Sequence, residues 1–260
     1  MRTLAALVAY DGTPFKGFQR QSAEKGPTVQ GALEAVIARI AGEAIAIEAA
    51  GRTDRGVHAT GQVVSFQTAA RHDPATWQRA LNALLPAEIA IRALCEAPPA
   101  FRARRSALAR RYRYRLFSDP VRAPLRERYA WRLAAPLNVA AMDAAATSLL
   151  GEHDFGAFGA SPRDDRATGY RGHTVRTLLE ARCRPVGAEE IACDFAANAF
   201  LTGMVRRLAG TLALVGQGRL SLAELRGILA ARDRAHPGTP APTAGLCLVG
   251  VDYPAGMLAW

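Results

Sequence analysis

Two periods of hydrophobic residues along the chain predict its secondary structure: every second position in strands, and every third or fourth in helices. In the first half, alternation or a short apolar run predicts strands over residues 2–10, 44–50, 62–68 and 88–97. Helical spacing follows Thr28, a good N-cap residue, and stops at Gly42. A second helix is predicted to begin at Asp73 and to end near Leu85.

The second half of the chain repeats this mixture of elements. Strands are predicted over residues 109–117, 177–186, 189–197 and 246–253, and helices over 137–150, 200–216 and 221–232. The elements do not alternate as βαβα units, so the pattern favours an α+β fold with largely antiparallel sheets. We expect an N-terminal α+β subdomain, 1–105, and a C-terminal α+β subdomain, 106–260.

Several classes of protein and of site are disfavoured by composition. No stretch of eighteen apolar residues lacks a charge, and the N-terminus does not have the long apolar region of a signal peptide, so we expect a cytoplasmic protein without membrane spans. The four cysteines form no C-x-x-C pair, which predicts buried reduced thiols rather than a zinc site. The five histidines do not cluster either, so we expect no metal.

Positive charge is concentrated in one segment. The chain has a net charge of +10, which indicates an anionic partner, most often nucleic acid. Residues 102–132 hold eleven Arg against Asp119 and Glu127. Five aromatic residues are interleaved with them, namely Tyr112, Tyr114, Phe117, Tyr129 and Trp131. Guanidinium planes and aromatic rings suit phosphates and unstacked bases. We therefore expect this segment to contact nucleic acid, the alternative being a solvated strand with ordinary charges.

A carboxylate is set in a sharp bend at residues 51–59, GRTDRGVHA. Glycines at both ends of GRTDRG allow tight backbone turns, and Asp54 lies between Arg52 and Arg55. A nearby cation favours the ionised carboxylate, which is then available as a nucleophile or base. The alternative is a structural Asp that hydrogen-bonds its own turn, and composition alone favours that alternative.

A family resemblance favours the catalytic interpretation of this bend. The bend and the GQVVSF that follows resemble the active-site motif of the tRNA pseudouridine synthase A (TruA) family. Six further motifs resemble that family in the same order along the chain: YDGTPFKGFQRQ, TVQGALE, SALARRYRYRL, GEHDFGAF, NAFLTGMVRRLAG and PAPTAGLCL. Together they span residues 10–250. The resemblance implies the α+β pseudouridine synthase fold, with two related subdomains and a catalytic cleft between them.

The resemblance also implies a reaction and a substrate. Members of the family isomerise uridine to pseudouridine at positions 38–40 of the tRNA anticodon stem-loop, work as homodimers and consume no cofactor. The aspartate that attacks the target uridine matches Asp54. The attack falls on ribose C1′ or on base C6, and the sequence does not separate these two routes.

Three further residues match family positions in the active site. Tyr112 matches the tyrosine that packs on the flipped base, the alternative being an aromatic residue of the core. Arg206 matches the arginine that pairs with the catalytic aspartate, and the neighbouring Arg207 would point about 100° away on the same helix. Leu246 matches an apolar residue that closes the other face of the base, the alternative being a core leucine.

Further residues are assigned to substrate binding or to support of the loop. The substrate-binding candidates are Arg52, Arg55, Phe18, Gln19, Arg110 and Arg111, with packing as the alternative for Phe18 and Gln19. His58 and Gln62 are expected beside the loop, His58 as a hydrogen-bonded structural imidazole.

Three positions depart from the family pattern. Arg55 replaces the usual Ala, Arg102 a common His and Arg105 a common Phe. The last change puts local packing of the sheet in doubt. None removes a catalytic candidate, so we expect an active enzyme with a more basic cleft.

Two rival functions remain open on the same scaffold. One is an RNA-binding protein without catalysis, such as a tRNA-folding chaperone, and the intact GRTD loop with Tyr112 and Arg206 argues against it. The other is a pseudouridine synthase that acts on another RNA site. A metal-dependent nuclease is disfavoured because acidic residues do not cluster in pairs.

Overall fold

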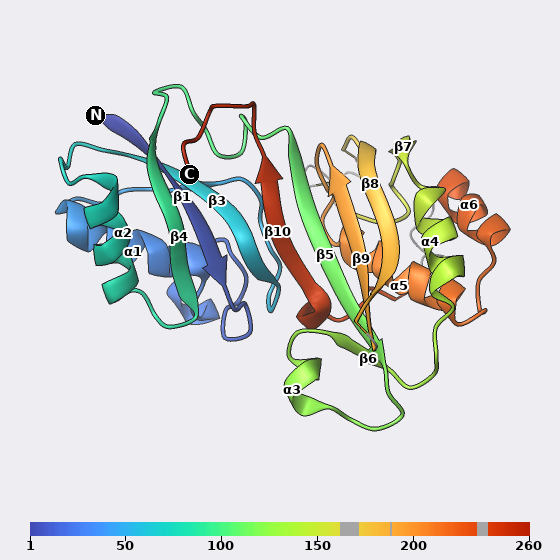
Figure 1. Cartoon of the computed structure of the whole chain (residues 1–260). Helices are drawn as coiled ribbons and strands as arrows, with labels where there is room; N and C mark the ends of the chain where they lie inside the picture. The colour runs from blue at the N-terminus through green and yellow to red at the C-terminus, as the bar shows by residue number, and fades with distance from the viewer. Residues whose placement is uncertain (162–171, 188, 233–238) are drawn as a thin grey trace. The chain divides into compact units, whose positions relative to one another are not determined.

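The structure is a computed structural model, which describes residues 1–161, 172–187, 189–232 and 239–260 (Figure 1). Packing divides the chain into unit 1, Met1–Arg110 with Cys247–Trp260, and unit 2, Arg111–Leu246. Each unit combines helices with a mixed, largely antiparallel sheet, so the predicted α+β class is confirmed. The expected division at residue 105 lies close to the first border between the units, whereas the last residues of the chain belong with unit 1.

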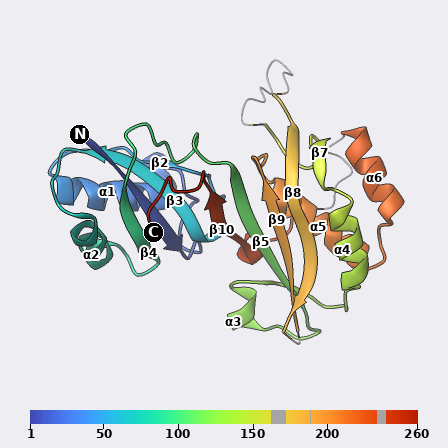
Figure 2. The ribbon, with the colours of Figure 1, turned by 45° about the horizontal axis from the view of Figure 1, so that its top comes forward.

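The sheet of unit 1 has the strand order β4-β1-β3-β10, with β2 beside β3. The strands are β1 (Arg2–Tyr10), β2 (Glu48–Ala49), β3 (His58–Thr68), β4 (Ile89–Ala97) and β10 (Leu246–Asp252), the last counted from Cys247. β1 runs antiparallel to β3 and β4, and β10 runs parallel to β3. The helices α1 (Val29–Ala41) and α2 (Pro74–Leu84) lie along this sheet (Figures 1 and 2). Both begin at the predicted caps, Thr28 and Asp73, whose side chains accept backbone N–H groups.

The other face of this sheet is covered by the chain's own C-terminus. A hydrophobic cluster forms on that face around Ala5, Val63 and Phe101, all of them buried. Tyr253, Met257 and Leu258 from the C-terminal segment pack against it. Both faces of the unit 1 sheet are therefore covered, which explains why β1 and β3 are buried along most of their length rather than at alternate positions only.

The predicted strand 44–50 is wrong for most of its length, because only Glu48–Ala49 forms a strand. Before it, the Ile47 N–H bonds to the Glu34 carboxylate at 3.2 Å instead of to a neighbouring strand. The same carboxylate accepts the Gln30 amide at 2.8 Å and pairs with Arg20 at 2.9 Å. The apolar run thus reflects burial of Ile45 and Ile47 against the helical layer, and not strand pairing.

The sheet of unit 2 has the order β5-β9-β8-β7, with β6 parallel to β5. Its strands are β5 (Ala109–Ser118), β6 (Trp131–Leu133), β7 (Gly151–Asp154), β8 (Val175–Val186) and β9 (Glu190–Ala197). Its helices are α3 (Pro124–Glu127), α4 (Val139–Thr147), α5 (Met204–Gly216) and α6 (Leu222–Ala231). α4 packs against β8 and against α5, and α5 is buried along most of its length (Figure 2). α6 begins at the predicted Ser221, which forms a capping box with Glu224.

Two helices of unit 2 are shorter than predicted. α5 begins at Met204 rather than at residue 200, because Thr202 bridges to Ala160 through both backbone groups and Gly203 adopts a left-handed φ of 74°. α4 begins after its cap Asn138 and ends at Thr147, beyond which the turns tighten to i−3 hydrogen bonds. The short elements α3, β6 and β7 and the 3₁₀ turns at Ala23–Lys25 and Thr243–Gly245 were not predicted.

The structure contains no helix, in the part that it describes, that is long and apolar enough to cross a membrane.

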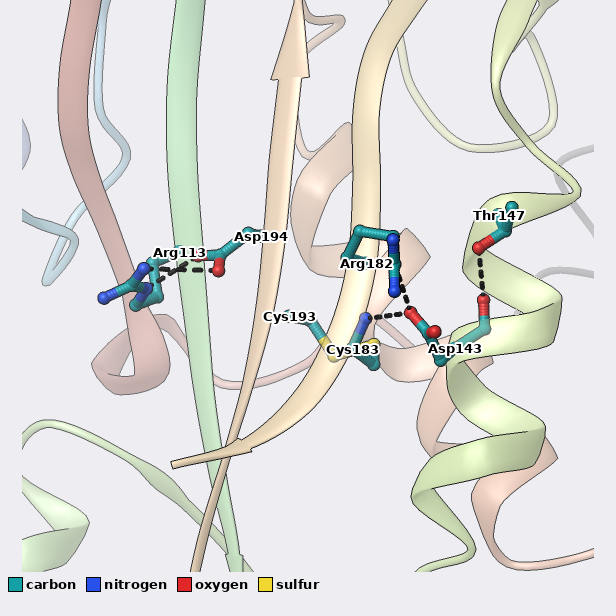
Figure 3. Close-up of a disulfide and its surroundings, with 7 residues drawn as sticks. All are labelled: Arg113, Asp143, Thr147, Arg182, Cys183, Cys193 and Asp194. Carbon is teal, nitrogen blue, oxygen red and sulfur yellow. Dashed lines mark hydrogen bonds and ion pairs between the residues drawn. A yellow bond between two sulfur atoms is a disulfide. The ribbon is translucent and has the colours of Figure 1, made fainter. Parts of the chain in front are cut away.

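A disulfide joins Cys183 of β8 to Cys193 of β9 (Figure 3). The prediction of buried reduced thiols is therefore wrong for this pair, whereas Cys95 is a buried cysteine outside the disulfide and Cys247 is only half-buried. The cause is the antiparallel register, which sets Cys183 opposite Cys193 with their Cα atoms 4.2 Å apart. In an antiparallel sheet, the Cα atoms of residues directly opposite at a non-hydrogen-bonded position come this close. The sequence does not show which cysteines will be opposite each other.

Reduction of this disulfide should lower the free energy of unfolding by roughly 3 kcal/mol, the loop-entropy value for a closed loop of about ten residues. Urea unfolding with and without a thiol reductant measures the difference. The matched control is the double variant Cys183→Ala, Cys193→Ala, which should not respond to the reductant. Equal stability of the wild-type protein in both buffers would contradict the cross-link.

β7 pairs with only the first residues of β8, and farther along this edge of β8 the Asp143 side chain of α4 takes the place of a neighbouring strand (Figure 3). Its Oδ1 accepts the Cys183 N–H and the Arg182 Nε–H, each at 2.9 Å. The hydrogen bond from Arg182 lowers the pKa of Asp143 below its ordinary value of 3.8. Partial burial opposes this shift, and the hydrogen bond from the Cys183 N–H adds to it. A lowered folded-state pKa stabilises the protein above pH 3.8, and this contribution is lost as the pH falls through the folded-state value.

Asp143→Asn should therefore lower the unfolding free energy at pH 7 by about 1 kcal/mol, because one charged hydrogen-bond acceptor is weakened. The difference from the wild type should narrow as the pH falls below 3.8, where the wild-type carboxylate also loses its charge. Thermal unfolding at a series of pH values measures both quantities. A difference that stays constant, or widens in acid, would contradict this role for Asp143.

Candidate functional site

Asp54 lies in a loop of unit 1 that connects β2 to β3. The Val57 N–H bonds to the Asp54 carbonyl at 3.1 Å, and Gly56 has a φ of 77° at the third position of this turn. A positive φ at that position is the mark of a type II turn and favours glycine. Asp54 and both flanking arginines, Arg52 and Arg55, are exposed, so the turn presents the carboxylate between two cations at the surface of the unit.

The entry to the loop is fixed by three sets of hydrogen bonds. The Ala50 N–H bonds to the Val63 carbonyl at 2.9 Å, which is the last contact of the ladder. Next along the chain, the Gln62 side chain bonds to both backbone groups of Gly51: its Nε2 donates to the carbonyl at 2.8 Å, and its Oε1 accepts the N–H at 3.3 Å. Arg110 donates from Nε to the Ala50 carbonyl at 3.1 Å.

The middle of the loop is fixed through Thr53, which is buried directly before the exposed Asp54. The Thr53 hydroxyl lies 2.7 Å from the Tyr10 hydroxyl, and the Thr53 carbonyl accepts the Phe18 N–H at 3.0 Å. The Phe18 ring is buried and lies against Tyr10, with 6.2 Å between ring centroids. This geometry fits the packing alternative for Phe18, whereas the neighbouring Gln19 is exposed.

The exit from the loop is fixed through His58, which is buried at the start of β3. Its Nδ1 accepts the Gly12 N–H at 3.1 Å and lies 3.2 Å from the Asp11 carboxylate. Gly12 runs so close to the loop that a Cβ atom there would overlap the Val57 carbonyl. The imidazole thus joins the 11–19 segment to the loop, which fits the structural role predicted for His58.

These contacts give the loop a fixed backbone and an exposed carboxylate. Such an arrangement suits a nucleophile or a base that acts on a substrate arriving from solution. Two cavities of unit 1, of about 400 and 300 Å³, are lined by residues other than Asp54. In the described ranges, no three His, Cys, Asp or Glu side chains gather so that they could hold a metal ion.

Tyr112, Arg206 and Leu246 lie in unit 2. Tyr112 is 8% exposed on β5, and its ring meets Phe200 edge to face at 5.2 Å between centroids. Arg206, in the first turn of α5, donates from Nε to the Ala241 carbonyl at 2.7 Å. One edge of its guanidinium is therefore fixed to the segment that leads to Leu246, a buried residue.

A second tyrosine of β5, Tyr114, packs against the segment that leads to Leu246. Tyr114 is fully buried two residues after Tyr112, and its hydroxyl donates to the Pro242 carbonyl at 2.7 Å. Burial raises the pKa of Tyr114 far above its ordinary value of 10, and the charge of Arg206 opposes this rise. A Cβ atom at Gly245 would lie 2.7 Å from the Tyr114 ring, so the 241–246 segment passes tightly against β5.

Three of the four arginines of β5 point to the face opposite its tyrosines, because side chains alternate along a strand. Tyr112 and Tyr114 are buried on one face, and three arginines lie on the other. Each of these arginines has a carboxylate partner: Arg111 with Glu180 at 2.8 Å, Arg113 with Asp194 at 2.6 Å and Arg115 with Glu190 at 3.3 Å. The interleaving seen in the sequence therefore does not bring these guanidinium groups and rings together on one surface.

Arginines near the start of the basic segment have structural contacts in unit 1. Besides Ala50, Arg110 donates to the carbonyls of Arg104, at 2.6 Å, and Ala107, at 3.3 Å. Arg102 lies 3.5 Å from Glu48. Arg105 is exposed, and the buried Phe101 and Ala103 supply the packing that its position had put in doubt.

Sequence reasoning missed the roles of Tyr10 and Thr53 at the candidate site. Both lie inside motifs that were noted, and a threonine directly before a candidate catalytic aspartate is a signal for a backbone anchor. What the motifs do not show is that the Tyr10 hydroxyl reaches Thr53 across the strand pair β1 and β3.

Comparisons with known proteins agree on one family. Residues 6–104 and 145–254 match the family model described as tRNA pseudouridine synthase. A protein of Chloroflexus aurantiacus named tRNA pseudouridine synthase A is 46% identical, over 100% of this chain and 92% of its own length. Proteins of the same name from Moorella thermoacetica and Brevibacillus brevis are each 43% identical, over 97% of this chain and 100% of their own length.

The close approach at Gly12 generates a prediction. Gly12→Ala should destabilise the protein by roughly 1–3 kcal/mol and loosen the Asp54 loop, because the added methyl group meets the Val57 backbone. Gly227→Ala is the matched control: Gly227 lies inside α6, no described atom outside the neighbouring helix backbone is within 4 Å of the added carbon, and the change should stabilise the protein by roughly 0.5–1 kcal/mol. Urea unfolding measures both, and a neutral Gly12→Ala would contradict the tight packing of the loop.

Proposed function

Because the chain belongs to the tRNA pseudouridine synthase family, we propose that it is an isomerase that converts uridine to pseudouridine at positions 38–40 of the tRNA anticodon stem-loop, with Asp54 as the nucleophile. The observation that carries this proposal is the exposed Asp54 carboxylate on a loop whose backbone is hydrogen-bonded before and after it. A buried carboxylate would instead have favoured a structural turn. The position in tRNA comes from the family resemblance.

The reaction exchanges one bond to the ribose for another. The N1–C1′ bond breaks, the base rotates, and C5 bonds to C1′. C5 loses a proton and N1 gains one, so atoms and electrons balance without a cofactor. The Asp54 carboxylate starts the reaction by attack on C1′ or on C6, and either attack needs the ionised form.

Tyr112 and Arg206 complete the proposed machinery. Tyr112 stacks on the flipped uracil, and its phenol assists removal of the C5 proton. The Arg206 guanidinium is the cationic partner of the Asp54 carboxylate and fixes its orientation. Its anchoring by the Ala241 carbonyl supports this role, because a guanidinium held at one edge loses less freedom when it binds an anion at another. Leu246 closes the other face of the base.

The net charge of +10 supports a polyanionic substrate, because contacts to phosphates supply much of the affinity for nucleic acid. Arg52 and Arg55 are exposed on either side of Asp54, where phosphates that flank the target uridine would lie. Gln19 and Arg111 are further exposed candidates, whereas the backbone contacts of Arg110 favour support of the loop. Binding energy of this kind offsets the few kcal/mol that base flipping costs. We also propose a homodimer, on the resemblance, and a cytoplasmic location, where a tRNA-modifying enzyme meets its substrate.

Asp54→Asn should abolish the modification while leaving the fold and tRNA binding in place. The substitution keeps the shape of the side chain and removes the nucleophile, so the rate should fall by at least about 10³-fold. Pseudouridine mapping of unmodified tRNA measures it, after incubation without added metal or nucleotide. The matched control is Asp73→Asn, which replaces one good helix cap of the same unit by another and should keep wild-type activity.

Each outcome of this mapping assigns the function. Modification at positions 38–40 by the wild type and the control, but not by Asp54→Asn, supports the proposal. Modification elsewhere keeps the chemistry and overturns the substrate. An inactive wild type that still binds tRNA favours the RNA-binding chaperone.

A further inference from the structure

Gln62 is a fully buried polar residue in the middle of β3, a strand that is buried along most of its length. Its register partner on β1 is Val8, and its side-chain amide uses one donor and one acceptor on the backbone of Gly51. Burying an amide in a core is unfavourable unless its hydrogen bonds are made. The two bonds to Gly51 therefore explain why this position tolerates burial of a polar group.

The place of these bonds indicates their purpose. β2 pairs with β3 at Ala49 and Val64, and the Ala50 N–H adds the last ladder bond, to Val63. At Gly51 the chain leaves the sheet, and the side-chain amide of Gln62, rather than the backbone of β3, bonds to the N–H and the carbonyl of Gly51. Gly51 is the first residue of the loop, and Asp54 follows three positions later.

We infer that Gln62 is a positioning residue, which sets the direction in which the chain leaves β2 and so the place of the Asp54 carboxylate. The inference rests on the proposed function of Asp54. A residue that served packing alone would need only the volume of its side chain, whereas positioning needs the donor and the acceptor together. Displacing a catalytic group by about 1 Å costs on the order of 10²-fold in rate.

Two substitutions separate these roles. Gln62→Met keeps the length of the side chain and removes both hydrogen bonds. Gln62→Glu keeps an acceptor for the Gly51 N–H, but its ionised form sets a negative oxygen against the Gly51 carbonyl. When protonated, the same side chain donates to that carbonyl and reproduces the pattern of glutamine. Burial favours the protonated form, so this variant should recover function as the pH falls.

Ser65→Ala is the matched control for loss of a buried hydrogen bond. Ser65 lies on the same strand, is also buried, and its hydroxyl accepts the Ala103 N–H at 3.0 Å. Its loss should lower the thermal midpoint without changing the direction of the Asp54 loop.

The test measures kcat and KM for tRNA, with the thermal midpoint, from pH 6 to pH 8.5. We expect Gln62→Met to lose about 10- to 100-fold in kcat with KM within about threefold, and Ser65→Ala to keep both. The kcat of Gln62→Glu, as a fraction of the wild-type value at the same pH, should rise at least about fivefold from pH 8.5 to pH 6.

Wild-type kcat in folded Gln62→Met, or a pH-independent ratio for Gln62→Glu, would overturn the positioning role. If Gln62→Met does not fold, the pH dependence of Gln62→Glu decides alone. Failure of the proposed function is a different result, because the wild-type enzyme would then not modify tRNA at all.

Discussion

The candidate site depends on the antiparallel register between β1 and β3. This register pairs Val8 with Gln62 and Tyr10 with Ala59. It thereby places the Tyr10 hydroxyl against Thr53, whereas the register of β2 with β3, which sets Ala49 opposite Val64, places the Gln62 amide against Gly51. Because side chains alternate between faces, a slip of one residue would turn Gln62 away and leave both polar groups of Gly51 without this partner. The pairings of β3 with β1 and with β2 thus determine where an exposed carboxylate lies.

A second constraint of the same kind governs unit 2. Alternation along β5 sends Tyr112 and Tyr114 to the buried face and Arg111, Arg113 and Arg115 to the other. The buried face meets the 241–246 segment through Tyr114 with Pro242, and Arg206 of α5 bonds to Ala241 of the same segment. The other face neutralises much of its own charge through cross-strand ion pairs. A row of arginines in the sequence is therefore an incomplete measure of the positive charge that a polyanion meets.

Most of the fold could be predicted from the sequence, because strong periodicity and caps such as Thr28, Asp73 and Ser221 act locally. The errors arise where contacts with residues distant in the sequence determine the local secondary structure. The 44–47 run looks like a strand until the Glu34 carboxylate of α1 takes the Ile47 N–H. The start of α5 is set by the bridge from Thr202 to Ala160.

The candidate site divides in the same way. Motifs identified Asp54, Tyr112 and Arg206, but composition alone would have treated Asp54 as a structural turn residue. The supporting bonds of Tyr10 and Gln62 depend on strand register, and so does the approach of Cys183 to Cys193. Register is a tertiary property, which the spacing of residues along one strand does not reveal.

In the proposed reaction, a fixed loop presents one carboxylate to a uridine, whose base is then reattached through C5. The chemistry has one unavoidable consequence: the hydrogen at C5 must leave for solvent. The most direct measurement is therefore the release of tritium from tRNA labelled at C5 of its uridines, in a single turnover with excess wild-type protein. The proposed reaction should release close to one tritium for each modified uridine. Bound tRNA that keeps all of its tritium would contradict it.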